Sequence, residues 1–127
     1  MAKTNLPSDL KNAIDPTSIT PSTPEDYLKR GWLYYSRGEY KLAEEDLRKA
    51  LSLNSDLIDA KYALALTLKA RKDYAEALNH FQLVLHSTGQ IEDKVKAAML
   101  RRLVQGHINH IQNGDWNLEK EIWQARN

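Results

Sequence analysis

One pattern of small and large apolar residues occurs twice in this chain, with a spacing of about 34 residues. The residues that correspond at this spacing are Gly31 and Ala65, Tyr40 and Tyr74, Ala43 and Ala77, Leu47 and Phe81, Ala50 and Val84, and Leu51 and Leu85. Small residues recur where two helices must approach closely, and large residues recur where a space between units must be filled. Such a unit cannot bury its apolar face alone, so the pattern predicts a stack of similar units.

Each unit has the pattern of two helices joined by a short turn. In the first unit, Thr23 can cap a helix whose first position is Pro24, and apolar residues follow at spacings of three and four up to Tyr35. Gly38 is suited to the left-handed conformation that ends such a helix, and a second helix is expected over 40–53. The predicted fold class is therefore all-α, built from antiparallel helix hairpins.

Three units account for the chain from residue 24 onward. The expected units are a first hairpin at 24–57, a second hairpin at 58–91, and a degenerate third hairpin at 92–127 that also caps the stack. The third unit follows an interruption of the period, and it is predicted to contain a long helix over about 91–112 and a final helix over 116–126. Glu119 occupies a position that holds a small residue in the other units, so the final helix is expected to pack less tightly.

The N-terminal residues 1–23 are rich in proline, serine and threonine. This composition predicts a flexible, extended segment, because proline removes a backbone donor and restricts the residue before it. Residues 7–14 have the apolar spacing of two helical turns, which are too short to be stable alone. The segment is expected either to be a frayed tail or to dock on the groove of this chain or of a neighbouring copy.

The repeated residues resemble those of the tetratricopeptide repeat family. The matching positions are Gly31, Tyr34, Gly38, Glu39, Tyr40, Ala43, Leu47, Ala50 and Leu51 in the first repeat, and Leu64, Ala65, Leu68, Asp73, Tyr74, Ala77, Phe81 and Leu85 in the second. The chain departs from the family where Ser55 and Gly89 replace its closing proline. The resemblance implies a right-handed superhelical stack of about three hairpins, with a concave groove lined by the first helix of each hairpin.

The resemblance also implies which residues line that groove. They are Leu28, Trp32, Tyr35, Asp59, Tyr62, Leu66, Lys69, Arg101, Val104, Ile108 and Ile111. The groove is expected to be apolar and aromatic with charged edges, which suits a peptide or an amphipathic helix of another protein. For Trp32 the alternative is packing within the chain, because a stack of three hairpins has little core.

The implied function is a non-catalytic interaction module that serves as a scaffold or in assembly. The alternative is a self-associating structural protein, a homo-oligomer whose terminal segments fill a neighbouring groove, since Trp116, Ile122 and Trp123 lie close to the C-terminus. Family members that bind the acidic tails of chaperones use lysine and asparagine where this chain has Leu28, Trp32 and Ala63. Chaperone tails are therefore not expected as ligands.

Composition and motifs disfavour other classes of function. The 18 lysine and arginine residues nearly balance 17 acidic residues, so neither nucleic acid nor an anionic membrane is expected as a partner. The absence of cysteine excludes disulfides and thiolate zinc sites. His107 and His110 lie three apart on one predicted helix, but no third ligand follows at a suitable spacing. We therefore expect no metal, no cofactor and no enzymatic activity, and the lack of a secretory signal favours a cytoplasmic protein.

Overall fold

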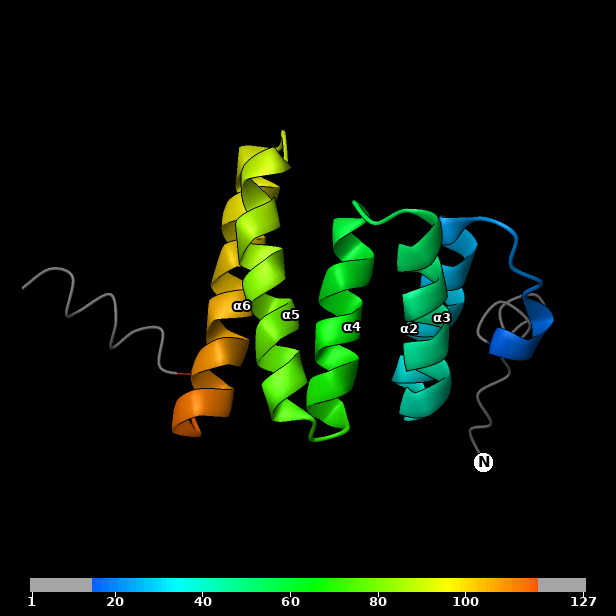
Figure 1. Cartoon of the computed structure of the whole chain (residues 1–127), viewed down its shortest axis with the longest axis horizontal. Helices are drawn as coiled ribbons and strands as arrows, with labels where there is room; N and C mark the ends of the chain where they lie inside the picture. Colours follow the sequence, from blue (N-terminus) through cyan, green and yellow to red (C-terminus); the bar gives the residue numbers. More distant parts are fainter. Residues whose placement is uncertain (1–14, 117–127) are drawn as a thin grey trace, which may run out of the picture.

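The computed structural model describes residues 15–116, and the regular secondary structure of this part is entirely helical. Its helices are α2 (Pro24–Ser36), α3 (Tyr40–Leu53), α4 (Ile58–Ala70), α5 (Tyr74–Ser87) and α6 (Lys94–Asn113), with short 3-10 turns η1 (Pro16–Ser18) and η2 (Thr88–Gln90). Helix α2 pairs with α3 and α4 pairs with α5, and α6 packs on α5 at one end of the row (Figure 1). The predicted all-α stack of helix hairpins is confirmed.

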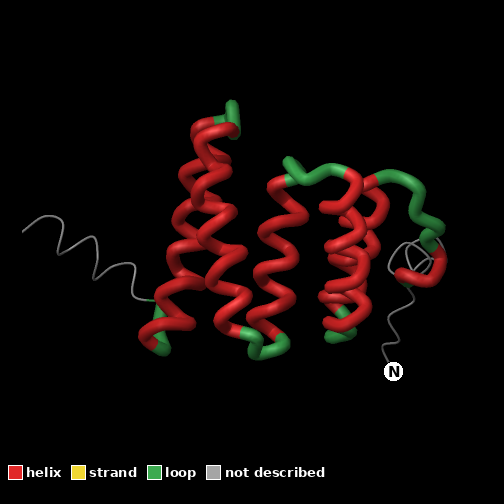
Figure 2. Tube along the Cα trace, in the orientation of Figure 1, coloured by secondary structure: helices red, strands yellow, loops and turns green. Residues whose placement is uncertain are grey.

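Short connections hold the helices of each hairpin together (Figure 2). At the start of α2, the Thr23 hydroxyl accepts a hydrogen bond from the Asp26 amide at 3.1 Å, and the Asp26 carboxylate accepts one from the Thr23 amide at 3.3 Å. This reciprocal capping satisfies amides that the helix leaves unpaired. The turn between α2 and α3 passes through Gly38 with φ 76°, as the sequence predicts.

The core lies where the hairpins meet. Its largest fully buried side chains are Phe81, Leu47, Leu64, Leu68, Val84 and Val104. The small residues of the repeat allow this packing: a Cβ atom added to Gly31 would lie 2.8 Å from Cδ2 of Leu47, well inside van der Waals contact. The repeated pattern of small and large residues therefore corresponds to close helix contacts and filled space.

Ion pairs also join the first hairpin to the second, on the side formed by α3 and α5. Glu44 pairs with Arg71, and the Arg48 guanidinium lies 2.6 Å from the carboxylate of Glu76. Arg48 also donates to Glu44 at 2.9 Å, so the four side chains form one connected network. Networks of this kind hold their geometry better than isolated surface pairs do.

The N-terminal part of the described chain differs from the expectation of an extended segment. Residues 15–23 include the turn η1, in which Pro16 is buried and Asp15 caps the turn by accepting a hydrogen bond from the Thr17 amide at 3.0 Å. The Arg30 guanidinium on α2 donates to the Ile19 carbonyl at 3.4 Å, which attaches this segment to the edge of the first hairpin. Burial of the proline ring and these polar contacts explain the difference. Residues 1–14, including the two predicted helical turns, lie outside the described part.

The last described helix begins later than the sequence predicts. The turn η2 occupies the interruption of the period, and α6 starts at Lys94, where the Asp93 carboxylate accepts hydrogen bonds from the amides of Val95 and Lys96. Gly114, with φ 82°, ends α6. The final helix predicted over 116–126 lies almost wholly outside the described residues. Within residues 15–116, no helix is both long and apolar enough to cross a lipid bilayer.

Candidate functional site

The residues predicted to line a groove are carried by α2, α4 and α6, and most of them are at least partly accessible. Leu28, Trp32 and Tyr35 on α2, and Tyr62, Leu66 and Lys69 on α4, are partly buried, whereas Asp59 and Arg101 are exposed. The carboxylate of Asp59 lies 3.9 Å from Nζ of Lys96 on α6, at the end of α4 opposite to Lys69. These side chains therefore share the face formed by the first helices.

Ile108 and Val104 are the exceptions, and their prediction as groove residues is wrong. Ile108 is only 3% exposed and belongs to the hydrophobic core, together with Val104. Residues four apart share one face of a helix, so Leu100, Val104 and Ile108 form a single buried row. Because α6 packs on α5, this row fills the interface and does not reach the groove.

Aromatic rings form the wall of the groove on α2. The rings of Trp32 and Tyr35 meet edge to face with their centroids 5.8 Å apart, and Tyr35 also contacts Tyr40 at 5.4 Å. Trp32 packs against the core and remains partly accessible. Burial raises the pKa of Tyr35, so its hydroxyl stays protonated at neutral pH.

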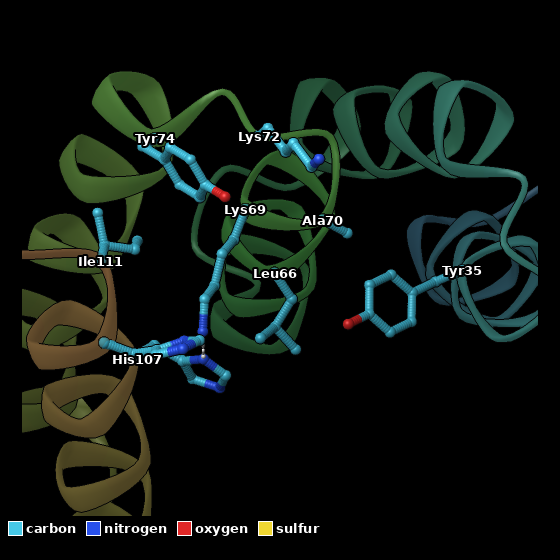
Figure 3. Close-up of a pocket in the computed structure, with 9 residues that line it drawn as sticks. Tyr35, Leu66, Lys69, Ala70, Lys72, Tyr74, His107 and Ile111 are labelled. Carbon is cyan, nitrogen blue, oxygen red and sulfur yellow. Dashed lines mark hydrogen bonds between the residues drawn. The ribbon is translucent and has the colours of Figure 1, made fainter. Parts of the chain in front are cut away.

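A cavity of about 500 Å³ opens at one end of the groove (Figure 3). It is lined by Tyr35, Leu66, Lys69, Ala70, Lys72, Tyr74, His107, His110 and Ile111. Of the predicted groove residues, the cavity brings together Tyr35, Leu66, Lys69 and Ile111. The sequence did not place Lys72 and Tyr74 in the groove, because both follow the last residue of α4. A comparison of the two turns would have pointed to Lys72, which stands where the first turn has Gly38.

His107 connects α4 to α6 inside this cavity. Nζ of Lys69 lies 3.0 Å from Nδ1 of His107, and because an ammonium group can only donate, Nδ1 accepts and the ring proton is on Nε2. Nε2 in turn lies 3.4 Å from the hydroxyl of Tyr62. The imidazole also stacks on the ring of Phe81 with a centroid distance of 5.2 Å.

The surroundings of His107 keep it uncharged. Burial, the positive charge of Lys69 and the neighbouring His110 lower the pKa of His107 from 6.5 to about 4. Its ring nitrogens face Lys69 and Tyr62, which leaves no lone pair free for a metal ion. Among residues 15–116, no three side chains of histidine, aspartate or glutamate lie close enough together to hold a metal.

This lowered pKa predicts that acid destabilises the fold through His107. In the unfolded chain His107 takes up a proton below pH 6.5, whereas in the folded chain it does so only near pH 4. The contribution of the uncharged His107 to the free energy of unfolding is therefore complete above pH 6.5 and is lost as the pH falls from 6.5 to 4. We expect the free energy of unfolding to fall by about 2 kcal/mol more in the wild type than in His107→Gln between pH 7.5 and 5. Urea denaturation at both pH values measures this difference. Equal losses in the two proteins would contradict the assignment.

Trp116 packs against α6 beside His107. A Cβ atom added to Gly106 would lie 2.1 Å from the Trp116 ring, so the indole lies directly on the glycine backbone. The Asn109 side chain donates to the Trp116 carbonyl at 3.0 Å, and the indole centroid lies 4.6 Å from the His107 ring. The chain has therefore turned back along α6 after Gly114.

Comparisons with known proteins agree with this architecture. Two tetratricopeptide repeat models match the chain, one over residues 24–57 and the other over residues 57–91. The chain is also 28% identical over 68 residues to a protein of Arabidopsis thaliana described as the E3 ubiquitin-protein ligase CHIP. That alignment covers 54% of this chain and 24% of the ligase, so the chain corresponds to a small part of that relative. No solved structure matches the chain.

Proposed function

Because the chain belongs to the tetratricopeptide repeat family, whose repeats mediate interactions between proteins, we propose that it binds a peptide or an amphipathic helix of another protein in the groove along α2, α4 and α6. The proposed role is that of a non-catalytic scaffold. The ligase that it resembles is matched over only 24% of its length, so ubiquitin transfer is not part of the proposal.

One observation carries the proposal: partly exposed apolar side chains border a cavity of about 500 Å³ at the end of the groove. Tyr35 and Leu66 line this cavity, and Trp32, which contacts Tyr35, packs against the core and is partly accessible. Rigid aromatic and aliphatic side chains of this kind are typical anchors of protein interfaces, because they lose little conformational entropy when a partner covers them. The cavity provides space for a side chain of the partner.

Selection of short random peptides displayed on phage tests this function. We expect the immobilised chain to enrich peptides whose affinity falls about tenfold or more when Trp32 or Leu66 is replaced by alanine, since anchors typically contribute over 1 kcal/mol. Fluorescence polarisation with the labelled peptide measures the change, and circular dichroism verifies the helical fold of each variant. The matched control is Leu83→Ala, an exposed leucine on α5. Unchanged affinity for both folded groove variants would contradict the proposed site.

A second candidate function is self-association, and an apolar stripe on α6 favours it. Val95, Met99 and Leu103 are spaced four residues apart and are 68%, 61% and 43% exposed. With Arg102 and Trp116, the last two border a shallow hollow of about 220 Å³. Exposed apolar side chains in a row are typical of surfaces that pack against another protein. In this candidate function, two copies of the chain would pack together through this stripe as well as through the terminal segments.

Light scattering coupled to size-exclusion chromatography tests self-association. In this case we expect the wild type to be a dimer or larger at tens of micromolar, and Met99→Glu/Leu103→Glu to be a monomer, because two buried carboxylates would oppose the contact. Leu53→Glu, which adds a charge at an exposed leucine of α3, is the control and should leave the assembly intact. A monomeric wild type would contradict this candidate.

A further inference from the structure

We propose that the cavity at the end of the groove binds the side-chain carboxylate of an aspartate or glutamate in the partner peptide, next to an apolar residue of that peptide. The inference rests on the proposed function, because it assigns a chemical class of partner to the same groove. It concerns residues other than those that bind chaperone tails in the family.

The charge on the cavity wall is positive and unbalanced. Lys69 and Lys72 line the cavity, and none of its lining residues is acidic. Within residues 15–116, neither lysine has an ion-pair partner. In the same part of the chain, Arg30, Arg48 and Arg71 are all paired with carboxylates. The cavity therefore holds two cationic groups and no acidic side chain to balance them.

Lys69 is held in place by neutral groups. Its ammonium group donates to the uncharged His107 at 3.0 Å and lies 5.5 Å from the centre of the Trp116 ring. These contacts orient the charge but do not neutralise it, and burial lowers the pKa of Lys69. A partly buried charge without an opposite charge is costly, so a carboxylate that arrives at this position gains more than it would at a fully hydrated lysine.

Lys72 has an unusual backbone conformation. Its φ is 67°, in the left-handed region that side chains other than glycine and asparagine rarely adopt. The corresponding turn of the first hairpin uses Gly38 with φ 76°. The second hairpin therefore has a lysine in this conformation where the first has a glycine, and Lys72 lines the cavity. Residues held in such conformations are concentrated at functional sites.

The other lining groups favour a carboxylate with an apolar neighbour. The hydroxyls of Tyr35 and Tyr74 are directed toward α4 in Figure 3, that of Tyr74 on the side of Lys69 and that of Tyr35 on the opposite side of Leu66. A tyrosine hydroxyl can donate a hydrogen bond. Leu66 and Ile111 provide apolar surface in the same cavity. Phosphate is bound best by the two-pronged geometry of arginine, and no arginine lines the cavity. The ammonium groups of the lysines and the hydroxyls of the tyrosines can each donate to a carboxylate oxygen.

The peptide selection described above, repeated on a charge variant, tests the inference. The variant Lys69→Gln/Lys72→Gln removes both cavity charges, and Lys41→Gln/Lys49→Gln removes two exposed charges from α3 as a matched control. We expect the wild type and the control to enrich an acidic residue at one position beside apolar residues, and the cavity variant to enrich the apolar residues alone. The peptides are displayed without a free C-terminus, so the acid selected is a side chain.

A second measurement assigns the contact to the cavity. Replacing the enriched acid of one selected peptide by its amide should weaken binding to the wild type about tenfold and binding to the cavity variant much less. Lys72→Gly removes one cavity charge without straining the backbone, because glycine adopts φ 67° readily. This variant should remain folded and lose part of the preference for acid.

The outcomes separate the inference from the proposed function. If the selected peptides carry no acidic residue but their affinity depends on Trp32 and Leu66, the carboxylate site is overturned and the groove function stands. An acid preference that persists in the cavity variant would overturn the carboxylate site as well. If no peptide depends on Trp32 or Leu66, the groove function itself fails, and the carboxylate site fails with it.

Discussion

Replacing Phe81 by alanine is expected to lower the free energy of unfolding by about 3–5 kcal/mol, the range typical of a phenylalanine removed from a packed core. Phe81 is fully buried in the second hairpin. Its ring stacks on the ring of His107, and its centroid lies 6.3 Å from that of Tyr62, so it packs against two residues beside the groove. Since small domains are stable by only about 5–15 kcal/mol, the variant should be largely unfolded at moderate urea concentrations.

Urea denaturation followed by circular dichroism measures the effect of Phe81→Ala. The control is Leu83→Ala, which truncates an exposed side chain on the same helix and should change the free energy of unfolding by less than about 0.5 kcal/mol. A loss below about 1 kcal/mol for Phe81→Ala would mean that neighbouring side chains fill the space left by the phenylalanine ring, contrary to the packing described.

The second large effect is expected for Asp46→Ala, which breaks a mostly buried ion pair. Both Asp46 oxygens accept hydrogen bonds from Arg30, each at 2.8 Å, and Asp46 is only 5% exposed. Arg30 also lies 5.9 Å from the ring centres of Tyr27 and Tyr34. Removing the carboxylate leaves this guanidinium without its partner. We expect a loss of about 2–3 kcal/mol, less than for a fully buried pair because Arg30 keeps some contact with water.

A double variant distinguishes the unpaired charge from a simple loss of packing. Arg30→Met/Asp46→Leu removes both charges and keeps apolar volume at both positions, so it should recover most of the stability lost in Asp46→Ala. Denaturation of the wild type and the two variants provides the comparison. A double variant as unstable as the single one would show that the ion pair itself, and not the stranded charge, holds α2 to α3.

Much of the fold could be predicted from the sequence because the repeat places the same physical requirement at the same position twice. Gly31 and Ala65 are small for the reason that the structure shows, a close approach between helices. Which face of α6 is buried could not be predicted in this way. The interruption before Lys94 breaks the period, so a position counted from the second repeat no longer identifies the face of the helix. For this reason Ile108 was assigned to the groove, although it lies in the core.

The cavity could be predicted only in part. Its apolar wall follows from positions on the first helices, but Lys69 and His107 lie 38 residues apart on different helices, and their contact depends on how α6 packs. Periodicity identifies faces of single helices and does not show which polar groups of two helices will meet. The turn η1 was missed for a related reason, since its buried Pro16 gains stability from α2 and not from its own neighbours in the sequence.

The ion pairs that join α3 to the second hairpin have a consequence for the elasticity of the stack. They join the two hairpins on the side away from the groove, through Glu44 with Arg71 and Arg48 with Glu76. A bend that narrows the groove spreads α3 from α5, so it must stretch these contacts. The ion pairs therefore oppose bending that narrows the groove but not bending that widens it. Ions in solution weaken them by screening. We therefore expect the curvature of the proposed groove to depend on ionic strength, through contacts on the opposite side of the stack.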